Sequence, residues 1–290
     1  MNRREFVKNS SLLGLGAVLM PDIEVFRKNK AIGIQLWSVR EDMKKDANGT
    51  LAALSKAGFK FVEGFGLEEG KWFGHDTTTF KKMLADNGLS MPSAHFGLKS
   101  SDYDSATKTL SDPWKKAIEA AHTLNQHYII SPWTIDEDRK DKDALKKLAD
   151  SMNHAGEICQ KEGMRFGYHN HWFEFEKVGD QLMYTTLLQN TDPKLVAFEM
   201  DLCWATYSQQ KPAEWFAKYA HRFELVHVKD VMAGTEKTTA IVGDGIVDFK
   251  NVIANAKLAG IKHYIIELEN YKTTAVQDVE TSLNRFKKLI

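Results

Sequence analysis

The 290-residue sequence has little cysteine, little proline and no excess of charge of either sign. Its two cysteines, Cys159 and Cys203, are too few for a disulfide framework or a four-thiolate zinc site. Basic and acidic residues both number 39, so the chain has no broad positive field to follow a nucleic-acid backbone. These absences argue against nucleic acid as a partner. They also imply that any bound metal is held mainly by His, Asp and Glu.

The sequence also lacks an apolar run long enough to anchor it in a membrane. Its start nevertheless resembles an export signal, with charged and aromatic residues ahead of a short apolar run, at Arg3, Arg4, Phe6, Lys8 and residues 12–20. The pattern is similar to the twin-arginine signal, whose pathway exports folded proteins. We therefore expect residues 1–30 to be a signal segment and residues 31–290 to be a periplasmic domain without a membrane partner. The alternative is an amphipathic N-terminal helix.

From residue 31 onward, short apolar runs of strand length alternate with longer stretches of helical period. Several helical stretches end at a glycine that can adopt the left-handed conformation, at Gly58, Gly88, Gly163 and Gly260. Eight such units predict a single α/β domain, a (β/α)8 TIM barrel. An open doubly wound sheet is disfavoured, because no G-x-G-x-x-G motif follows the first strand. The predicted strands span Ala31–Trp37, Phe59–Phe65, Ser90–Phe96, His127–Trp133, Met164–His171, Lys194–Asp201, Phe223–Lys229 and Lys262–Glu269.

Polar residues collect at the predicted carboxyl ends of the strands, where a barrel has its mouth. Residues i and i+2 of a strand point the same way, so two polar residues at this spacing would face the mouth together. The last four strands each carry such a pair, and three earlier strands add single residues, giving His169/His171, Glu199/Asp201, His227/Lys229, Glu267/Glu269, Gln35, Glu63 and His95. Ionised groups inside a barrel are costly unless they are paired or bound to metal.

This set predicts one divalent ion, Mn²⁺, Mg²⁺, Co²⁺ or Zn²⁺, with one ligand from each of four strands. Structural alternatives exist for the same residues. His169 or His171 could be hydrogen-bonded only, and Asp201 could cap the following helix. His227 and Lys229 could belong to a buried polar network without metal.

Four tryptophans fall at or just after strand ends, at Trp37, Trp133, Trp172 and Trp204. Their flat apolar faces suit the C–H surface of a sugar ring, so a small carbohydrate is the expected partner. Core packing explains any single one of them equally well. The segment Gly243-Asp244-Gly245 favours a turn over an anion site. The sequence leaves open whether the protein forms a homo-oligomer.

The chain from Ile32 to its end resembles the xylose-isomerase-like TIM-barrel superfamily, the sugar phosphate isomerase/epimerase group that also includes inosose dehydratase. The matching motifs are GIQLWSVR at 33–40, SAHF at 93–96, YHNH at 168–171, EMDxxW at 199–204, HVKD at 227–230, VGDGxVDF at 242–249 and IE at 266–267. The resemblance implies a metal-dependent carbohydrate enzyme. It assigns the metal ligands to His169, Asp201, His227 and Glu267.

The chemistry shared by this superfamily is removal of a proton next to a carbonyl. Candidate acid and base groups in this sequence are Glu267, His171, Glu174 and Lys229, with His95 as a donor to a substrate hydroxyl. At strand five, His169 stands where the epimerases carry glutamate, and the YHNH run is closer to the dehydratase branch.

We therefore expect isomerase or epimerase chemistry on an unphosphorylated keto-sugar or keto-glycoside, because the mouth shows no Arg-rich anion site. The alternative is a lyase, dehydratase or hydratase acting on a 3-keto-sugar. A third alternative is an exported sugar-binding protein without chemistry.

Overall fold

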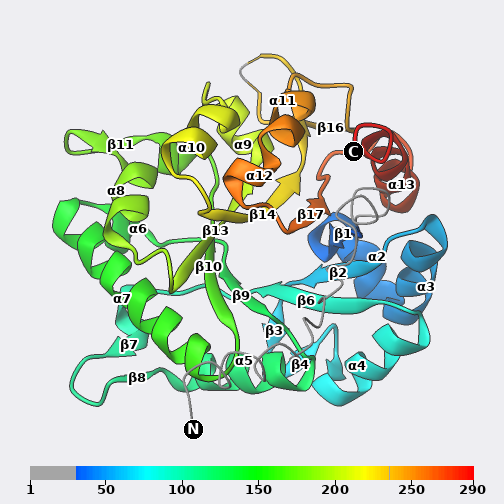
Figure 1. The fold of residues 1–290 in the computed structure, drawn as a ribbon. Coiled ribbons are helices and arrows are strands. Elements are labelled where there is room, and N and C mark those ends of the chain that lie inside the picture. Colours follow the sequence, from blue (N-terminus) through cyan, green and yellow to red (C-terminus); the bar gives the residue numbers. More distant parts are fainter. Residues whose placement is uncertain (1–30, 235) are drawn as a thin grey trace, which may run out of the picture. The chain divides into compact units, whose positions relative to one another are not determined.

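The computed structural model describes residues 31–234 and 236–290 (Figure 1). Eight parallel strands close into a barrel in the order β1-β17-β14-β13-β10-β9-β6-β2. This confirms the predicted α/β class and the (β/α)8 barrel. The barrel strands are β1 Ile32–Gln35, β2 Phe61–Gly64, β6 Ser90–His95, β9 Tyr128–Ser131, β10 Arg165–His169, β13 Val196–Asp201, β14 Phe223–Val228 and β17 His263–Ile266.

Helices surround the barrel strands (Figure 1). The α-helices are α2 Arg40–Lys45, α3 Ala47–Ala57, α4 Thr77–Asp86, α5 Asp112–Thr123, α6 Asp136–Arg139, α7 Lys142–Lys161, α8 Met183–Asn190, α9 Leu202–Tyr207, α10 Pro212–Lys218, α11 Phe249–Ala254, α12 Ala256–Ala259 and α13 Ala275–Phe286. Short 3-10 helices are η2 Leu36–Val39, η3 Ser100–Asp102 and η4 Phe173–Phe175. In α7, Leu145, Leu148 and Met152 are fully buried, as expected for an amphipathic helix that packs on a barrel.

Local chemistry sets where these helices begin and end. The Asp46 side chain accepts a hydrogen bond from the Gly49 amide at 2.9 Å and so caps α3. Asp248 caps α11 in the same way through the Asn251 amide at 3.0 Å. All four glycines predicted to end helices have positive φ, between 65° and 87° at three of them and 105° at Gly58.

The strands end earlier than the sequence predicts. Leu36 and Trp37 belong to η2, and the residues from Glu267 to Glu269 lie beyond β17. Beyond β17, backbone amides donate to side-chain hydroxyls instead of to a neighbouring strand. The Leu268 amide donates to Ser38 Oγ at 3.0 Å, and the Glu269 amide donates to Thr239 Oγ1 at 3.0 Å. The polar residues predicted at strand ends therefore lie partly on mouth loops.

The interior of the barrel below the mouth is apolar and tightly packed. A separate buried cluster fills it, formed by Phe61, Tyr128, Ile130, Ala197, Leu225 and Ile265. Two glycines make room for it. A Cβ at Gly33 would lie 2.1 Å from Phe61 Cε2, and a Cβ at Gly167 would lie 2.5 Å from Ile130 Cδ1. With this floor filled, ligands can reach only the carboxyl ends of the strands.

Small antiparallel sheets, which no pattern in the sequence predicted, follow four of the eight barrel strands, β2, β6, β10 and β14. Each lies in a βα connection, and these connections build the mouth of a barrel. They are β3 Leu67–Glu68, β4 Lys71–Trp72 and β5 His75–Asp76 after β2, β7 Tyr103–Asp104 and β8 Thr109–Leu110 after β6, β11 Lys177–Val178 and β12 Gln181–Leu182 after β10, and β15 Asp230–Val231 and β16 Thr239–Ala240 after β14.

The predicted signal segment, residues 1–30, lies outside the described residues. Among the helices that the structure describes, none is both long and apolar enough to cross a bilayer.

Candidate active site

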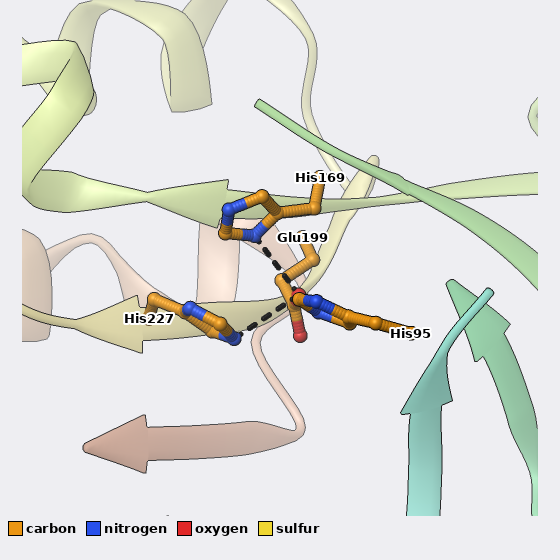
Figure 2. A group of neighbouring side chains, drawn as sticks. All are labelled: His95, His169, Glu199 and His227. Atoms are coloured by element: carbon orange, nitrogen blue, oxygen red, sulfur yellow. Dashed lines mark hydrogen bonds and ion pairs between the residues drawn. The ribbon is translucent and has the colours of Figure 1, made fainter. Parts of the chain in front are cut away.

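The carboxylate of Glu199, at the end of β13, lies at the centre of three histidines. Its Oε2 is 2.8 Å from His95 Nε2, 3.0 Å from His169 Nδ1 and 3.1 Å from His227 Nε2. Figure 2 shows the three imidazoles around this carboxylate, each from a different strand. We call His95, His169, Glu199 and His227 the Glu199 cluster. It forms a polar layer directly above the apolar interior.

Glu63, at the end of β2, is a second buried acceptor for the same imidazoles. Its Oε1 is 2.7 Å from His227 Nε2 and 3.1 Å from His95 Nε2, and Gln35 Nε2 donates to it at 2.9 Å. Burial would lower the pKa of His95, but Glu63 and Glu199 raise it to about 9. Burial likewise opposes ionisation of Glu63, yet His95 and His227 hold the pKa of this carboxyl well below its usual range. The layer is therefore a network of ionised carboxylates and at least one cationic histidine.

A second group lies nearer the mouth. Asp201, His227 and Glu267 place one donor atom each within 4.8 Å of one another, and we call them the Asp201 cluster. His227 Nδ1 is 2.7 Å from Glu267 Oε2, on the side of the ring opposite Glu199. Asp201 Oδ1 accepts a hydrogen bond from the Trp204 amide at 2.9 Å, so Asp201 is the N-cap residue of α9.

The other oxygen of Asp201 stays available. Oδ2 is buried and has no hydrogen-bond partner among the described residues. It lies 3.6 Å from Lys229 Nζ and 3.9 Å from His169 Nε2. A buried carboxylate oxygen without a hydrogen bond is costly, and a bound cation is one way to satisfy it.

These contacts give the two ring nitrogens of His169 and of His227 different partners. His169 Nδ1 and His227 Nε2 face Glu199, which leaves His169 Nε2 and His227 Nδ1 toward Asp201 and Glu267. Metal-bound histidines in proteins usually donate their other ring N–H to a carboxylate in this way. The donor set of two imidazoles and two carboxylates thus fits a divalent ion, with Glu199 and Glu63 as the carboxylates that orient the ligands.

Lys229 is buried beside these carboxylates. Its ammonium forms an ion pair with Glu269, lies 3.4 Å from Glu267 Oε2, and sits 4.6 Å from the centre of the Trp204 ring. Burial lowers the pKa of Lys229, but the surrounding carboxylates, Glu267 foremost, raise it well above the usual value. The group is therefore a cationic donor at neutral pH rather than a base.

A mouth cavity of about 370 Å³ opens above the Asp201 cluster. All four predicted tryptophans line it, together with ionisable residues of the site, giving Trp37, Trp133, Trp172, Trp204, His95, His169, His171, Lys229, Glu267 and Glu269. Trp37 and Trp133 are 41% and 44% exposed, whereas Trp204 is buried. Large aromatic side chains left this exposed offer a surface for a ligand ring.

His171 and Glu174 differ in their access to this cavity. His171 lines it, and its buried Nδ1 has no hydrogen-bond partner within the described part of the chain. Burial and the charge of Lys229 lower the pKa of His171 to about 3, so its ring is neutral at pH 7. Glu174 lies behind it and accepts hydrogen bonds from the Tyr168 hydroxyl at 2.6 Å and the His171 amide at 2.8 Å. Glu174 therefore holds the His171 loop and does not line the cavity.

The Gly243-Asp244-Gly245 segment is a turn, as the sequence favours. Its amides bind an internal anion, because the Asp230 carboxylate accepts from Gly243 N at 2.8 Å and Gly245 N at 3.1 Å. Spacing at the strand ends had marked Glu63 and Glu199 as polar mouth residues, but it did not predict that they accept hydrogen bonds from the three histidines.

The closed barrel and the histidine–carboxylate mouth together define a barrel enzyme of the α/β class. The chain belongs to the xylose isomerase-like TIM barrel family, whose model matches residues 51–289. A solved sugar phosphate isomerase/epimerase from Parabacteroides distasonis is 32% identical, with a TM-score of 0.76, over 89% of this chain and 93% of that one. Inosose dehydratase from Clostridium beijerinckii is 26% identical over 230 residues, which cover 70% of this chain and 74% of the relative.

A third comparison concerns metal. The solved IOLI protein, which has a bound zinc atom, shares the fold with a TM-score of 0.70 at 13% identity, over 89% of this chain and 97% of that one. The family model, the solved isomerase/epimerase and the inosose dehydratase place the chain among the enzymes of the carbohydrate isomerase, epimerase and dehydratase group.

Proposed function

We propose that the protein binds one divalent metal ion and removes a proton next to the carbonyl of an unphosphorylated keto-sugar or keto-glycoside, as an isomerase or epimerase does. The observation that carries this proposal is that Asp201, His227 and Glu267 place donor atoms within 4.8 Å of one another, with His169 Nε2 3.9 Å from Asp201 Oδ2, beside a tryptophan-lined cavity.

The ligands would be His169, Asp201, His227 and Glu267, and the donor types allow Mn²⁺, Mg²⁺, Co²⁺ or Zn²⁺. The zinc atom bound in the IOLI structure, which has the same fold, supports a bound metal. When bound, such an ion polarises a carbonyl oxygen and stabilises the enediolate that forms after proton removal.

The chain's own groups suit the steps around that chemistry. Although burial raises its pKa, Lys229 and His227 hold the pKa of Glu267 well below its usual range, so this carboxylate is ionised and can accept a proton. The Lys229 ammonium can donate to the oxygen on which negative charge develops. His95 and His171 border the same cavity and can bind substrate hydroxyls. The tryptophans would hold the apolar face of the ring and exclude water.

A lyase reaction, dehydration or hydration of a 3-keto-sugar, is the second candidate. Two points favour it: the inosose dehydratase relatives, and the resemblance to the epimerases, which implies that His169 stands where they carry glutamate. With one carboxylate base instead of two, proton removal would be followed by loss of a β-hydroxyl rather than by reprotonation on the opposite face. NMR spectra of the products distinguish the two, because only the lyase changes the number of carbon-bound hydrogens and hydroxyls.

Charge supports an unphosphorylated substrate. The one basic side chain among the cavity residues named above, apart from histidines, is Lys229, and it is already paired with Glu269. A phosphate dianion would gain little there. We also propose, from the N-terminal sequence, that the mature protein works outside the cytoplasm.

Deuterium exchange tests the function. Purified protein loaded with each metal is incubated in D₂O with keto-sugars, 3-keto-glycosides and sugar phosphates, and incorporation is read by NMR. Glu267→Gln should reduce exchange at the carbon next to the carbonyl by the roughly 10²–10⁴-fold typical of a positioned acid/base group. Glu214→Gln, at an exposed site on α10, should leave exchange unchanged. Undiminished exchange in Glu267→Gln, or turnover of sugar phosphates alone, contradicts the proposal.

A further inference from the structure

A second and larger cavity adjoins the mouth cavity. It has a volume of about 980 Å³ and lies over α6, the start of α7, η4 and the β11–β12 hairpin. We call it the outer cavity. Trp133 and Trp172 line both cavities, so the two spaces share these aromatic walls. None of the proposed chemistry uses the outer cavity, which leaves its purpose to be explained.

The walls of the outer cavity combine aromatic faces with evenly balanced charge. Trp133 is 44% exposed, and its ring meets Phe173 edge-on with 4.9 Å between centroids. The Arg139 guanidinium lies 4.1 Å from the centre of the Phe173 ring and forms an ion pair with Asp136. The lining holds four acidic and four basic residues, so it gives no net attraction for an anion.

The end of α7 in this cavity does not provide an anion site either. Asp141 caps the helix by accepting from the Ala144 amide at 2.8 Å, and Asp143 lies in its first turn. These carboxylates already occupy the positive end of the helix dipole. Lys142, from the same turn, is paired with Asp180 at 2.6 Å. A neutral ligand with many hydroxyls and an apolar ring face fits such walls better than a phosphate does.

We propose that the outer cavity is a subsite for the second ring of the substrate, so that the enzyme acts on two-ring glycosides. The reacting ring would lie in the mouth cavity over Glu267, and the glycosidic bond would cross between Trp133 and Trp172. The second ring, a sugar or an aromatic aglycone, would lie against Trp133, Phe173 and Arg139. This inference rests on the proposed function for the identity of the reacting ring, but its binding can be tested without catalysis.

Binding of unreactive probes separates the two cavities. Titration calorimetry of the metal-loaded protein would compare one-ring probes, methyl α- and β-glucoside, with two-ring probes, maltose, cellobiose and phenyl α- and β-glucoside. We expect at least one two-ring probe to bind about tenfold or more tightly than the one-ring probe of the same anomer, because the added ring covers aromatic surface. Equal affinities for both classes, including no measurable binding of either, would overturn the proposal.

Variants assign the gain to the outer cavity. Val178→Arg, from the β11–β12 hairpin, places a long side chain into the cavity, and Arg139→Ala removes the group stacked on Phe173. Both should abolish the two-ring advantage and leave one-ring affinity unchanged. The matched control is Val276→Arg, at a similarly half-buried valine on α13 that lines neither cavity. A two-ring advantage that survives in both cavity variants contradicts the assignment.

Exchange measured in parallel on 3-keto derivatives of the same probes keeps the two proposals distinct. Absent exchange with an intact two-ring advantage contradicts the proposed function and supports the subsite. Exchange that is equal on one-ring and two-ring substrates, with equal affinities, supports the function and contradicts the subsite.

Discussion

At the scale of single residues, the site depends on which nitrogen of each histidine is occupied by a carboxylate. Glu199 contacts His169 Nδ1 and His227 Nε2, and it thereby orients the remaining nitrogens toward Asp201 and Glu267. Sequence spacing placed all of these residues at the mouth. It could not separate ligands from orienting groups, because both kinds of residue occur at i and i+2 of one strand, as Glu199 and Asp201 do, and residues at this spacing face the same side.

Two conservative substitutions distinguish these roles. Asp201→Asn keeps an oxygen that can cap α9 but removes the ligand charge, whereas Glu199→Gln keeps a hydrogen-bond acceptor but removes an orienting charge. We expect metal affinity, measured by competition with a chelator, to fall by roughly 10–100-fold in Glu199→Gln, and by more in Asp201→Asn. The reverse order would mean that the Glu199 cluster itself holds the ion.

Glu174 provides a pH-dependent test of a buried residue. Burial raises its pKa to about 7, against hydrogen bonds from Tyr168 and the His171 amide that favour the charged form. In the unfolded chain its pKa is about 4.3, so between these values the folded state binds the extra proton and the free energy of unfolding falls as pH rises. The stability that Glu174 contributes is therefore fully present below about pH 4.3, and it is lost as the pH rises from there to about 7.

The Glu174→Gln variant lacks this titration. The free energy of unfolding of the wild type minus that of the variant should decrease between pH 5 and pH 8, by at most about 3 kcal/mol. Urea denaturation at four pH values measures it, and Glu176→Gln, at a neighbouring exposed site, is the control. A difference that stays constant across the range would show that Glu174 titrates normally.

At the scale of elements, the repeating pattern of strand, helix and glycine predicted all eight barrel strands. The signal was strong because barrel strands are buried apolar runs and several helices end at glycine with positive φ. The two-residue strands of the mouth sheets were not predictable, since a segment such as Lys177–Val178 is too short to show a period. The outer cavity is lined in part by the β11–β12 hairpin and by η4, so no periodic pattern predicted it.

The packing of the barrel floor makes a prediction about Gly33. A Cβ there would meet the Phe61 ring at 2.1 Å, so Gly33→Ala should destabilise the protein by roughly 1–3 kcal/mol through overpacking. Gly97→Ala, where no atom lies within 4 Å of the new Cβ, is the control. In the double variant with Phe61→Leu the two losses should be less than additive, because the smaller side chain leaves room for the methyl group. Additive losses in denaturant titrations would place the strain elsewhere.

At the scale of the whole molecule, charge and fold agree about the kind of ligand. The charges of the full chain cancel, and each cavity holds a cation paired with a carboxylate, Lys229 with Glu269 and Arg139 with Asp136. Composition predicted the neutrality of the chain, because net charge depends only on the counts of residue types. The pairing of Lys229 with Glu269 joins distant parts of the chain, and only the closed barrel brings these together.

The last prediction concerns where the molecule works. Residues 1–30 carry six basic and three acidic groups, so their removal would leave 33 basic and 36 acidic groups on a mildly acidic domain. If the twin-arginine route exports the folded barrel, changing Arg3 and Arg4 to lysine should retain the protein in the cytoplasm, since that route reads the arginine pair rather than its charge. Cell fractionation shows where the protein is, and mass spectrometry of the N-terminus shows whether the signal segment has been removed. Lys8→Arg, which keeps the arginine pair, is the control. Finding the wild-type chain at full length and wholly in the cytosolic fraction would contradict export, whereas export of the lysine variant would show that another pathway carries it.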